Sequence, residues 1–565
     1  MSASDKKKLR KEQNAAAMTE RQKKAKKEAN ATKAYTLTFI VVMVLVVAIF
    51  LGITLKTPVT GLINRVTTAV TIDGHKLTSV ELNYYYMDFI QAYASQYDDY
   101  GSYSSTYLML YTGLNVSTPL DEQVYNTTTG ETWADYFATA ATENAKWAYA
   151  MYDKAVSAGY QLTDSEQKNL DLQEENLELY ATYYGYSDAK SYLRGVYGPG
   201  ATVKSYMEYT RINTIANSFA GDYYDGLEFG DPDYREYEKD KMNDYNSYTF
   251  SYYFCTVNDF LKFNGGGTTE KDENGNETTT YTDEQKEQAR KDAEAAAKGL
   301  AIADNSTLEK LNAAVKALDI HKDKKEEDLE KVAASENTYV LYGALSNTIT
   351  EEGIKWLSDS ARKPGDITSI EVKSGEGENA TVNGYYVLLF QEMTTNEKPL
   401  ANVQHILVKF TGGTKDAETG ETTYSDAEKQ ATKEKAQAIL DEFLKGEKQD
   451  SAAFTKLAAQ KSEDTGSKDS GGLIEDIYRD SNYVQSFKDW ALDDRKVGDT
   501  GIIESEYGYH VMFYKEDDEL TYRDYMIDID MTNDAYDEWE TAVLDAVTLT
   551  AKNLKALDRD LVISG

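Results

Sequence analysis

The chain has 565 residues, enough for several domains, and 41% of them are hydrophobic, which excludes wholesale disorder. The formal net charge is −36, and residues 1–34 carry 11 Lys and Arg against 4 Asp and Glu, so the rest of the chain carries −43. A body this acidic repels phosphates, which argues against nucleic-acid binding, and the single cysteine, Cys255, excludes an intrachain disulfide.

Residues 36–55 form an uncharged, apolar run that follows the basic N-terminal stretch. A helix needs about 20 such residues to cross a hydrocarbon core, and basic residues collect on the cytoplasmic side. We therefore predict a basic cytoplasmic tail over 1–34, a transmembrane signal anchor over 35–56 and an extracytoplasmic remainder. The alternatives are a cleaved signal peptide, which is usually shorter and followed by a cleavage site of small residues, and a buried core helix.

Residues 57–247 are expected to form a helical region. Residues 68–82 alternate in polarity around Asp73 and Gly74, which predicts a β-hairpin, and Ser79 is expected to cap the next helix. Apolar residues then recur at steps of three and four, which predicts helices over 132–158, 163–184, 187–197 and 203–224. The many tyrosines here are interpreted either as core residues or as the lining of a binding groove.

An internal repeat follows the helical region. The motifs KFNGG and GYYV at 262–266 and 384–387 correspond to KFTGG and GYHV at 409–413 and 508–511. In each copy a helix with a capping box is expected, at Thr282 and at Ser425. We therefore predict an α+β fold with a first module over 248–396, a second module over 397–518 and a C-terminal helical segment over 519–565.

Two of the four histidines, His405 and His510, lie on apolar strands of the second module. The loop that carries Asp464 lies between them in the sequence. Two imidazoles and a carboxylate can fix one another's tautomers by hydrogen bonds, so we expect a functional triad, with a purely structural polar network as the alternative. A metal site is not expected, because no further strong ligand has suitable spacing, and no cofactor is expected.

Four motifs of the second module occur in a fixed order: NVQHILV at 402–408, KSEDTGSKDSGG at 461–472, KVGD at 496–499 and YGYHV at 507–511. With these motifs the module resembles the parvulin-type peptidyl-prolyl isomerases. The resemblance implies catalytic roles for four residues and a proline pocket lined by three more; these are His405, Asp464, His510 and Ser505, and then Ile474, Tyr483 and Phe487. The family commonly has GGDLGWF and GQM where this chain has GGLIEDI at 471–477 and SNY at 481–483.

The whole arrangement, a membrane anchor followed by helices and parvulin-like modules, resembles the PrsA-like and SurA-like foldases. The resemblance implies a single-pass membrane protein that isomerises X-Pro bonds and chaperones unfolded or newly exported proteins. The alternative is a non-catalytic, membrane-anchored holdase with a relic parvulin module. An adhesin or cell-wall scaffold would leave the four motifs unexplained.

The first module is expected to be degenerate and catalytically inert. Tyr386 stands where the second module has His510, and two alignments place either Tyr252 or Asn258 at the position of His405. The module would then serve as a scaffold or a peptide-binding surface. The two remaining histidines of the chain, at 75 and 321, are expected to be exposed and without a role.

Overall fold

The computed structural model describes residues 59–557 and 559, apart from 272–276, 376–379 and 417–418. The chain divides into two compact units. Unit one combines the chain up to Leu227 with the chain from Asp534 onward, and unit two spans Glu228–Asn533. The anchor predicted at 35–56 lies outside the described residues, and within the described part no helix has both the length and the apolar character for a membrane crossing.

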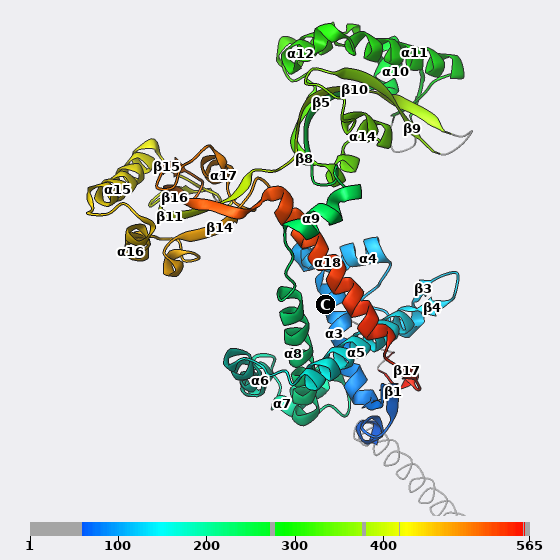
Figure 1. Ribbon diagram of the computed structural model, residues 1–565. Coiled ribbons are helices and arrows are strands. Elements are labelled where there is room, and N and C mark those ends of the chain that lie inside the picture. Colours follow the sequence, from blue (N-terminus) through cyan, green and yellow to red (C-terminus); the bar gives the residue numbers. More distant parts are fainter. Residues whose placement is uncertain (1–58, 272–276, 376–379, 417–418, 558, 560–565) are drawn as a thin grey trace, which may run out of the picture. The chain divides into compact units, whose positions relative to one another are not determined.

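Unit one is mainly helical (Figure 1). Its helices are α3 (Ser79–Ser95), α4 (Ser104–Thr112), α5 (Trp133–Ala158), α6 (Asp164–Tyr183), α7 (Ala189–Tyr197) and α8 (Val203–Asp225), and its hairpins are β1 (Thr68–Ile72) with β2 (His75–Thr78) and β3 (Val124–Asn126) with β4 (Glu131–Thr132). The predicted first hairpin is therefore present. Thr78, not Ser79, caps α3, because the Thr78 hydroxyl accepts from the Glu81 amide and the Glu81 carboxylate accepts in return.

The core of unit one is built on small and aromatic side chains. On α5 a row of buried alanines recurs at steps of three and four, at positions 134, 138, 141, 145 and 148. Tyr84, Tyr85 and Tyr86 of α3 are buried in the same cluster. At the end of α6, in contrast, Tyr183 and the C-cap residue Tyr184 are exposed. The tyrosines therefore form core on α3 and surface on α6.

The C-terminal segment contains the predicted helix, but the helix does not extend through the whole segment. Helix α18 (Tyr522–Asp545) is followed by strand β17 (Leu549–Ala551), which pairs antiparallel with β1. In unit one, Val543 packs with Met151 and Ala220, and Trp147 Nε1 donates to Glu540 at 2.6 Å. A strand of three residues depends on a distant partner, so its local sequence carries no signal for it.

Unit two contains both modules, preceded by α9 (Asp231–Tyr237). The first module comprises β5 (Ser247–Thr256), α10 (Val257–Asn264), β6 (Thr268–Lys271), β7 (Glu277–Thr280), α11 (Asp283–Leu300), α12 (Leu308–Lys316), α13 (Glu326–Leu329), β8 (Ser335–Leu341), α14 (Glu351–Leu357), β9 (Ile367–Ser374) and β10 (Thr381–Thr394). The second comprises β11 (Pro399–Lys409), β12 (Thr414–Lys415), β13 (Thr422–Thr423), α15 (Asp426–Lys445), α16 (Ser451–Lys461), β14 (Leu473–Ile477), α17 (Gln485–Leu492), β15 (Thr500–Glu504) and β16 (Gly508–Thr521).

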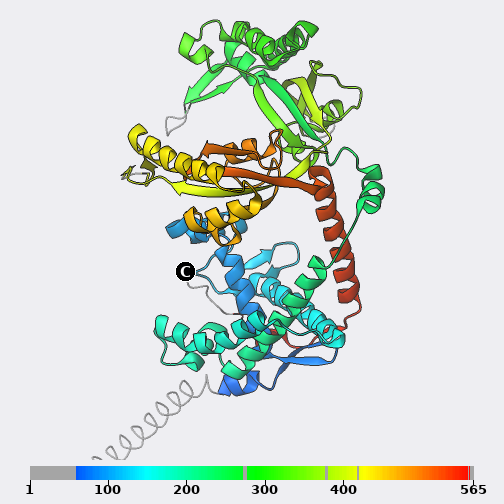
Figure 2. The same cartoon turned by 60° about the vertical axis from the view of Figure 1, so that its left-hand side comes forward.

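The two modules have sheets of the same topology. The strand orders are β8-β5-β10-β9 and β14-β11-β16-β15, and every pairing is antiparallel. In the first module α11 and α12 cover one face of the sheet, as Figures 1 and 2 show, and α14 packs on the other. In the second module α15 and α16 cover one face and α17 the other. The first module additionally inserts α10 after its first strand.

Candidate active site

His405 and His510 lie side by side on the sheet face that α17 covers. His405 on β11 is opposite Met512, and His510 on β16 is opposite Leu407, so the two imidazoles are diagonal neighbours. Both are buried, with 4% and 5% exposure. Their Nδ1 atoms are 3.0 Å apart and their ring centroids 5.2 Å. One strand pair therefore brings together two histidines that are distant in the sequence.

Asp464 reaches His405 from the loop that follows α16. Asp464 Oδ2 lies 3.0 Å from His405 Nε2, and Ser467 Oγ lies at the same distance from that nitrogen. The Ser467 hydroxyl also donates to Asp464 at 2.5 Å. Ser462 fixes the loop to β11, because its oxygen accepts from the amides of Leu407 and Asp464.

Gly472 joins the end of this loop to β11. Its carbonyl accepts from the His405 amide at 2.8 Å, and its φ is +77°. A Cβ at this position would lie 2.2 Å from the His405 carbonyl oxygen. Glycine is needed here both for the backbone conformation and for the close approach.

Ser505 lies at the other end of the histidine pair, in the turn between β15 and β16. Its Oγ is 2.8 Å from His510 Nε2. Its amide donates to the Gly508 carbonyl at 2.8 Å, which closes the turn. The structure therefore brings His405, Asp464, His510 and Ser505 together in one cluster.

The protonation states follow from burial and from the neighbours. Burial lowers the pKa of His405 in spite of the Asp464 charge, and burial together with His405 lowers the pKa of His510 to about 4. Burial acts to raise the pKa of Asp464, but hydrogen bonds from Ser467, the Gly466 amide and His405 bring it below its ordinary value. At neutral pH the cluster holds two neutral imidazoles and a carboxylate.

These charges set the direction of the hydrogen bonds. An ionised Asp464 only accepts, so His405 donates from Nε2. The Nδ1 of neutral His405 then accepts from Nδ1 of His510, and His510 Nε2 accepts from the Ser505 hydroxyl. The result is a continuous chain of hydrogen bonds from Ser505 to Asp464, hereafter the relay. Its carboxylate end is partly exposed, at 27% for the Asp464 side chain.

The three side chains expected in the proline pocket lie beside the relay. Phe487 is buried and packs edge-on against His405 and His510, with centroid distances of 5.3 and 5.7 Å. Tyr483 lies 5.6 Å from Phe487 and is 40% exposed. Ile474 on β14 packs against the same apolar cluster as Phe487. The wall therefore runs from a buried floor at Phe487 to an exposed rim at Tyr483.

Sequence reasoning missed two residues of the site. Ser467 stands three residues after Asp464, a spacing at which serine often bonds a nearby polar group. Met512 is fully buried opposite His405 and shares the apolar cluster with Phe487. It follows His510 by two residues, so the alternation along a strand places it on the same face. Both residues could have been found from these local rules.

Comparison with known proteins places the second module. Residues 385–517 match the family model of the PPIC-type PPIase domain. The foldase protein PrsA of Clostridium botulinum, strain Okra, is 32% identical over 123 residues, which are 22% of this chain and 29% of that protein. The second module is a parvulin domain.

The similarity to known proteins extends over only part of the chain and of its relatives. The chain spans 29% of the length of the curated PrsA relatives that it matches. The solved structure of PrsA from Bacillus subtilis is 14% identical and covers 74% of this chain and 88% of that one, with a TM-score of 0.23. The structure of PrsA from Bacillus anthracis is 20% identical and covers 27% and 59%, with a TM-score of 0.17.

The first module carries tyrosines where the parvulin domain carries histidines. Counted from the glycine of the GYYV and GYHV motifs, the central strand pair has the same register in both modules. Tyr252 thereby corresponds to His405 and Tyr386 to His510, and the two tyrosine rings are 5.2 Å apart. The alignment with Asn258 is wrong, because Asn258 lies in the inserted helix α10.

A cavity of about 690 Å³ lies in the first module, bounded by β5, α10, α11 and β10. Its lining includes Phe254, Asp259 and Arg290 and shares no residue with the relay. This cavity and the histidine pair of the parvulin domain therefore lie in different modules.

Of the other two histidines, His321 contradicts the expectation of exposure, whereas the side chain of His75 is 38% exposed. His321 is 8% exposed, its Nε2 is 2.9 Å from the Tyr253 hydroxyl, and burial lowers its pKa. His75 is half-buried, and its Nε2 is 3.0 Å from Asp153. The charged or turn residues next to them in the sequence hid partners that only the fold supplies.

Proposed function

We propose that this chain is an extracytoplasmic peptidyl-prolyl cis-trans isomerase and chaperone that assists the folding of exported proteins. The observation that carries the proposal is the relay from Ser505 to Asp464 beside the Phe487 wall. The clients would be unfolded or newly exported proteins that contain X-Pro bonds.

The reaction needs no covalent chemistry. Rotation about an X-Pro bond meets a barrier of about 20 kcal/mol and takes tens of seconds or longer without catalysis. The planar amide is stabilised by resonance, which places negative charge on the carbonyl oxygen. The twisted transition state has lost this resonance and has a pyramidal nitrogen. A catalyst therefore has to bind the twisted form better than the planar one.

The apolar wall would hold the proline ring. Phe487 forms the floor of the pocket, and Ile474 and Tyr483 stand beside it. Because the ring is held by these side chains, the residue before proline is the part that turns. Contact with the ring is similar in the planar and twisted forms, so this wall contributes chiefly to substrate binding.

The relay would supply the electrostatic preference. The Asp464 carboxylate disfavours the negative carbonyl oxygen of the planar amide more than the less negative oxygen of the twisted form. His405 and His510 are neutral and hold the carboxylate in place. The Ser505 hydroxyl completes the relay by donating to His510 Nε2. Removal of Asp464 takes away the acceptor that sets the direction of the remaining hydrogen bonds.

The rest of the chain would place this site at the membrane. We propose that residues 1–34 are a cytoplasmic tail, 35–56 a signal anchor, 57–247 a chaperone region and 248–396 an inert parvulin-like scaffold. The charge difference across the apolar run supports the orientation. The matched sheet topology and the Tyr252–Tyr386 pair support the inert first module.

A second candidate is a holdase without isomerase activity. The supporting observation is the exposure of apolar side chains at the C-terminal end of α6, where Leu179, Tyr183 and the C-cap residue Tyr184 are 63%, 80% and 61% exposed. Grouped exposed apolar side chains are typical of surfaces that bind other proteins.

One refolding experiment separates the two candidates. The full chain, in detergent micelles, is added to an unfolded protein whose slow refolding phase is limited by proline isomerisation. We expect the wild type to accelerate this phase and Asp464→Ala to lose the acceleration, whereas Asp469→Ala, an exposed carboxylate in the same loop, behaves as wild type. Suppressed aggregation without acceleration by the wild type would refute the isomerase and favour the holdase.

A further inference from the structure

The loop between β14 and α17, residues 478–484, carries the outer wall of the proline pocket and is called the pocket loop. It folds on itself, because the Ser481 hydroxyl donates to the Tyr478 carbonyl at 2.7 Å and the Tyr483 amide donates to the Ser481 carbonyl at 2.8 Å. Tyr483 then packs on Phe487, which contacts His405. The position of the pocket loop therefore sets the width of the pocket.

The first anchor of the pocket loop comes from α18, which follows the second module. The Tyr522 hydroxyl donates to Asp480 Oδ2 at 2.7 Å. The rings of Tyr478 and Tyr522 are stacked, with centroids 4.8 Å apart and planes 16° apart. Tyr522 is 8% exposed, and burial together with Asp480 raises its pKa. The loop is thus held both by a hydrogen bond and by a ring stack.

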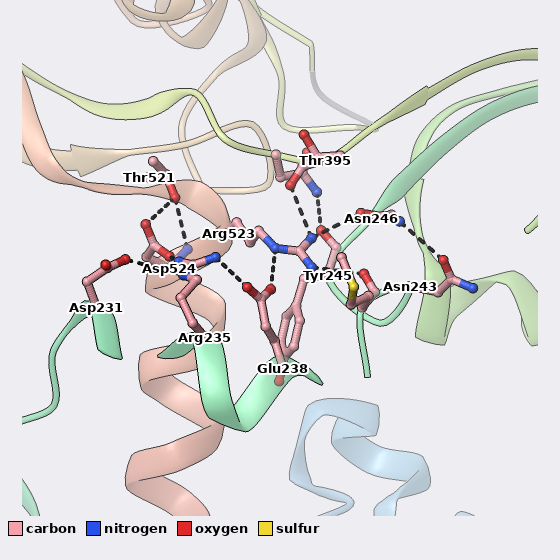
Figure 3. A network of polar contacts seen from close by, with 12 residues as sticks. Asp231, Arg235, Glu238, Asn243, Tyr245, Asn246, Thr395, Thr521, Arg523 and Asp524 are labelled. Carbon is pink, nitrogen blue, oxygen red and sulfur yellow. Dashed lines mark hydrogen bonds and ion pairs between the residues drawn. The ribbon is translucent and has the colours of Figure 1, made fainter. Parts of the chain in front are cut away.

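The anchor is itself fixed by its neighbour Arg523, which is 3% exposed. Figure 3 shows the Arg523 guanidinium facing Glu238, Asn246 and Thr395. Its Nε lies 2.5 Å from Glu238 Oε2, and its Nη1 donates to Asn246 Oδ1 at 3.0 Å and to the Thr395 carbonyl at 3.3 Å. The start of α18 is therefore tied to the segments that begin and end the first module.

The second anchor comes from the first module. The guanidinium carbon of Arg479, in the pocket loop, lies 3.3 Å from the ring centroid of Tyr339 on β8. Tyr339 has a φ of +54°, which is uncommon for a bulky side chain. Its amide donates to Thr249 Oγ1 at 3.1 Å, which holds this conformation. A cation over an aromatic face is attracted by the ring.

We propose that Tyr522 and Tyr339 are positioning residues for the proline pocket, which act through the pocket loop on Tyr483. This inference rests on the proposed isomerase function and deepens it: the pocket is shaped by residues that lie outside the parvulin domain. Because Tyr483 contacts the proline ring and not the turning bond, loss of an anchor weakens substrate binding. The relay is unchanged by such a loss, so the rate of the bound substrate stays as it is.

The test uses the full chain in detergent micelles, with an X-Pro peptide as substrate. Tyr522→Phe removes the bond to Asp480 and keeps the stack, and Arg479→Gln removes the cation at an exposed position that does not endanger folding. We expect each to raise KM about threefold or more and the pair to raise it further, with kcat within about twofold of wild type. Hydrogen exchange at the amides of residues 481–484 should become faster.

Two variants serve as controls. Tyr339→Phe keeps the aromatic face and should behave as wild type. Tyr234→Phe removes a matched tyrosine–aspartate bond to α18, from the Tyr234 hydroxyl to Asp528 at 2.9 Å, and should leave KM unchanged.

The outcomes separate this inference from the proposed function. If the double variant Tyr522→Phe/Arg479→Gln leaves both KM and the exchange of residues 481–484 unchanged, or lowers kcat in place of raising KM, the inference is overturned. If the wild type shows no turnover, the proposed function fails. In that case hydrogen exchange in the pocket loop alone decides whether the anchors position the loop. Faster exchange in the double variant would support the inference, and unchanged exchange would overturn it.

Discussion

Tyr252 and Tyr386 meet across β5 and β10 in the register in which His405 and His510 meet across β11 and β16, and ring centroids are 5.2 Å apart in both pairs. The Tyr386 hydroxyl donates to the Thr348 carbonyl at 3.3 Å. Two tyrosine rings can pack against each other as the two imidazoles do. A neutral imidazole, however, donates a hydrogen bond from one ring nitrogen and accepts one at the other, which a tyrosine ring cannot do. The first module thus has the fold without the relay.

The first prediction follows from this difference. His510→Ala in the full chain should lower kcat/KM for an X-Pro peptide by about tenfold or more, because the relay is interrupted and the first module contributes no turnover. Tyr386→Phe is the matched change in the first module and should leave the value at the wild-type level. Half or more of the wild-type turnover in His510→Ala would contradict the assignment of both modules.

The second prediction concerns acid. The pKa of His510 is lowered from 6.5 to about 4 by burial and by His405, so the unfolded chain binds more protons than the folded one between these values. The contribution of His510 to the free energy of unfolding should therefore be fully present above pH 6.5. It should be lost as the pH drops toward 4, which lowers the free energy of unfolding by about 3 kcal/mol for this one group.

Hydrogen exchange of the β11 and β16 amides measures this change locally. His510→Asn should show a smaller loss between pH 6.5 and 4, because it lacks the titrating imidazole. Equal losses in the variant and the wild type would show that His510 is not buried in its neutral form.

The third prediction tests the charge of Asp464. Asp464→Asn keeps the shape, removes the charge and should lower turnover about tenfold or more. Asp464→Cys should regain turnover as the pH rises through the ordinary thiol pKa of about 8.5, because the thiolate restores a negative charge. A flat pH profile for Asp464→Cys, at the level of Asp464→Asn, would mean that the charge has no role.

The sequence predicts elements that have their own local signals. The capping boxes predicted at Thr282 and Ser425 are present, and the helix predicted over 163–184 lies where expected. Strand β17 was not predicted, because it depends on pairing with β1. The capping role of Thr78 was not predicted, because the sequence does not show which of the two adjacent hydroxyls, at 78 or 79, accepts from an amide of the first helical turn. The periodicity of apolar residues therefore predicts a helix or strand, whereas the distant segment that it contacts is known only from the fold.

The site follows the same division. His405, Asp464, His510 and Ser505 were expected from motifs, and the structure brings them together. The direction of the relay was not predictable, since it depends on burial of both imidazoles and on the distance between two Nδ1 atoms. The contacts of Tyr522 and Tyr339 with the pocket loop were also hidden, because they come from outside the four motifs.

The fourth prediction concerns the buried ion pair of Arg523. Arg523→Ala leaves Glu238 with one buried partner fewer and should lower the free energy of unfolding of unit two by about 3–5 kcal/mol. The double variant Arg523→Met/Glu238→Met should recover much of this loss, because the buried carboxylate is removed together with its buried partner, and Arg235 keeps its pairs with Asp231 and Asp524.

Urea unfolding, followed by amide exchange in β5 and β11, measures these changes. Lys398→Ala is the control, because the exposed pair of Lys398 with Asp494 should contribute about 1 kcal/mol or less. A loss of that small size in Arg523→Ala would show that the pair does not hold the start of α18.

Exchange NMR on a peptide with resolved cis and trans X-Pro signals measures isomerase activity without a protease or a folding client. With the full chain at about one hundredth of the peptide concentration, we expect cis–trans exchange far faster than the uncatalysed process of tens of seconds, and a return to the uncatalysed rate for His510→Ala. Uncatalysed exchange with the folded wild-type chain would contradict this expectation.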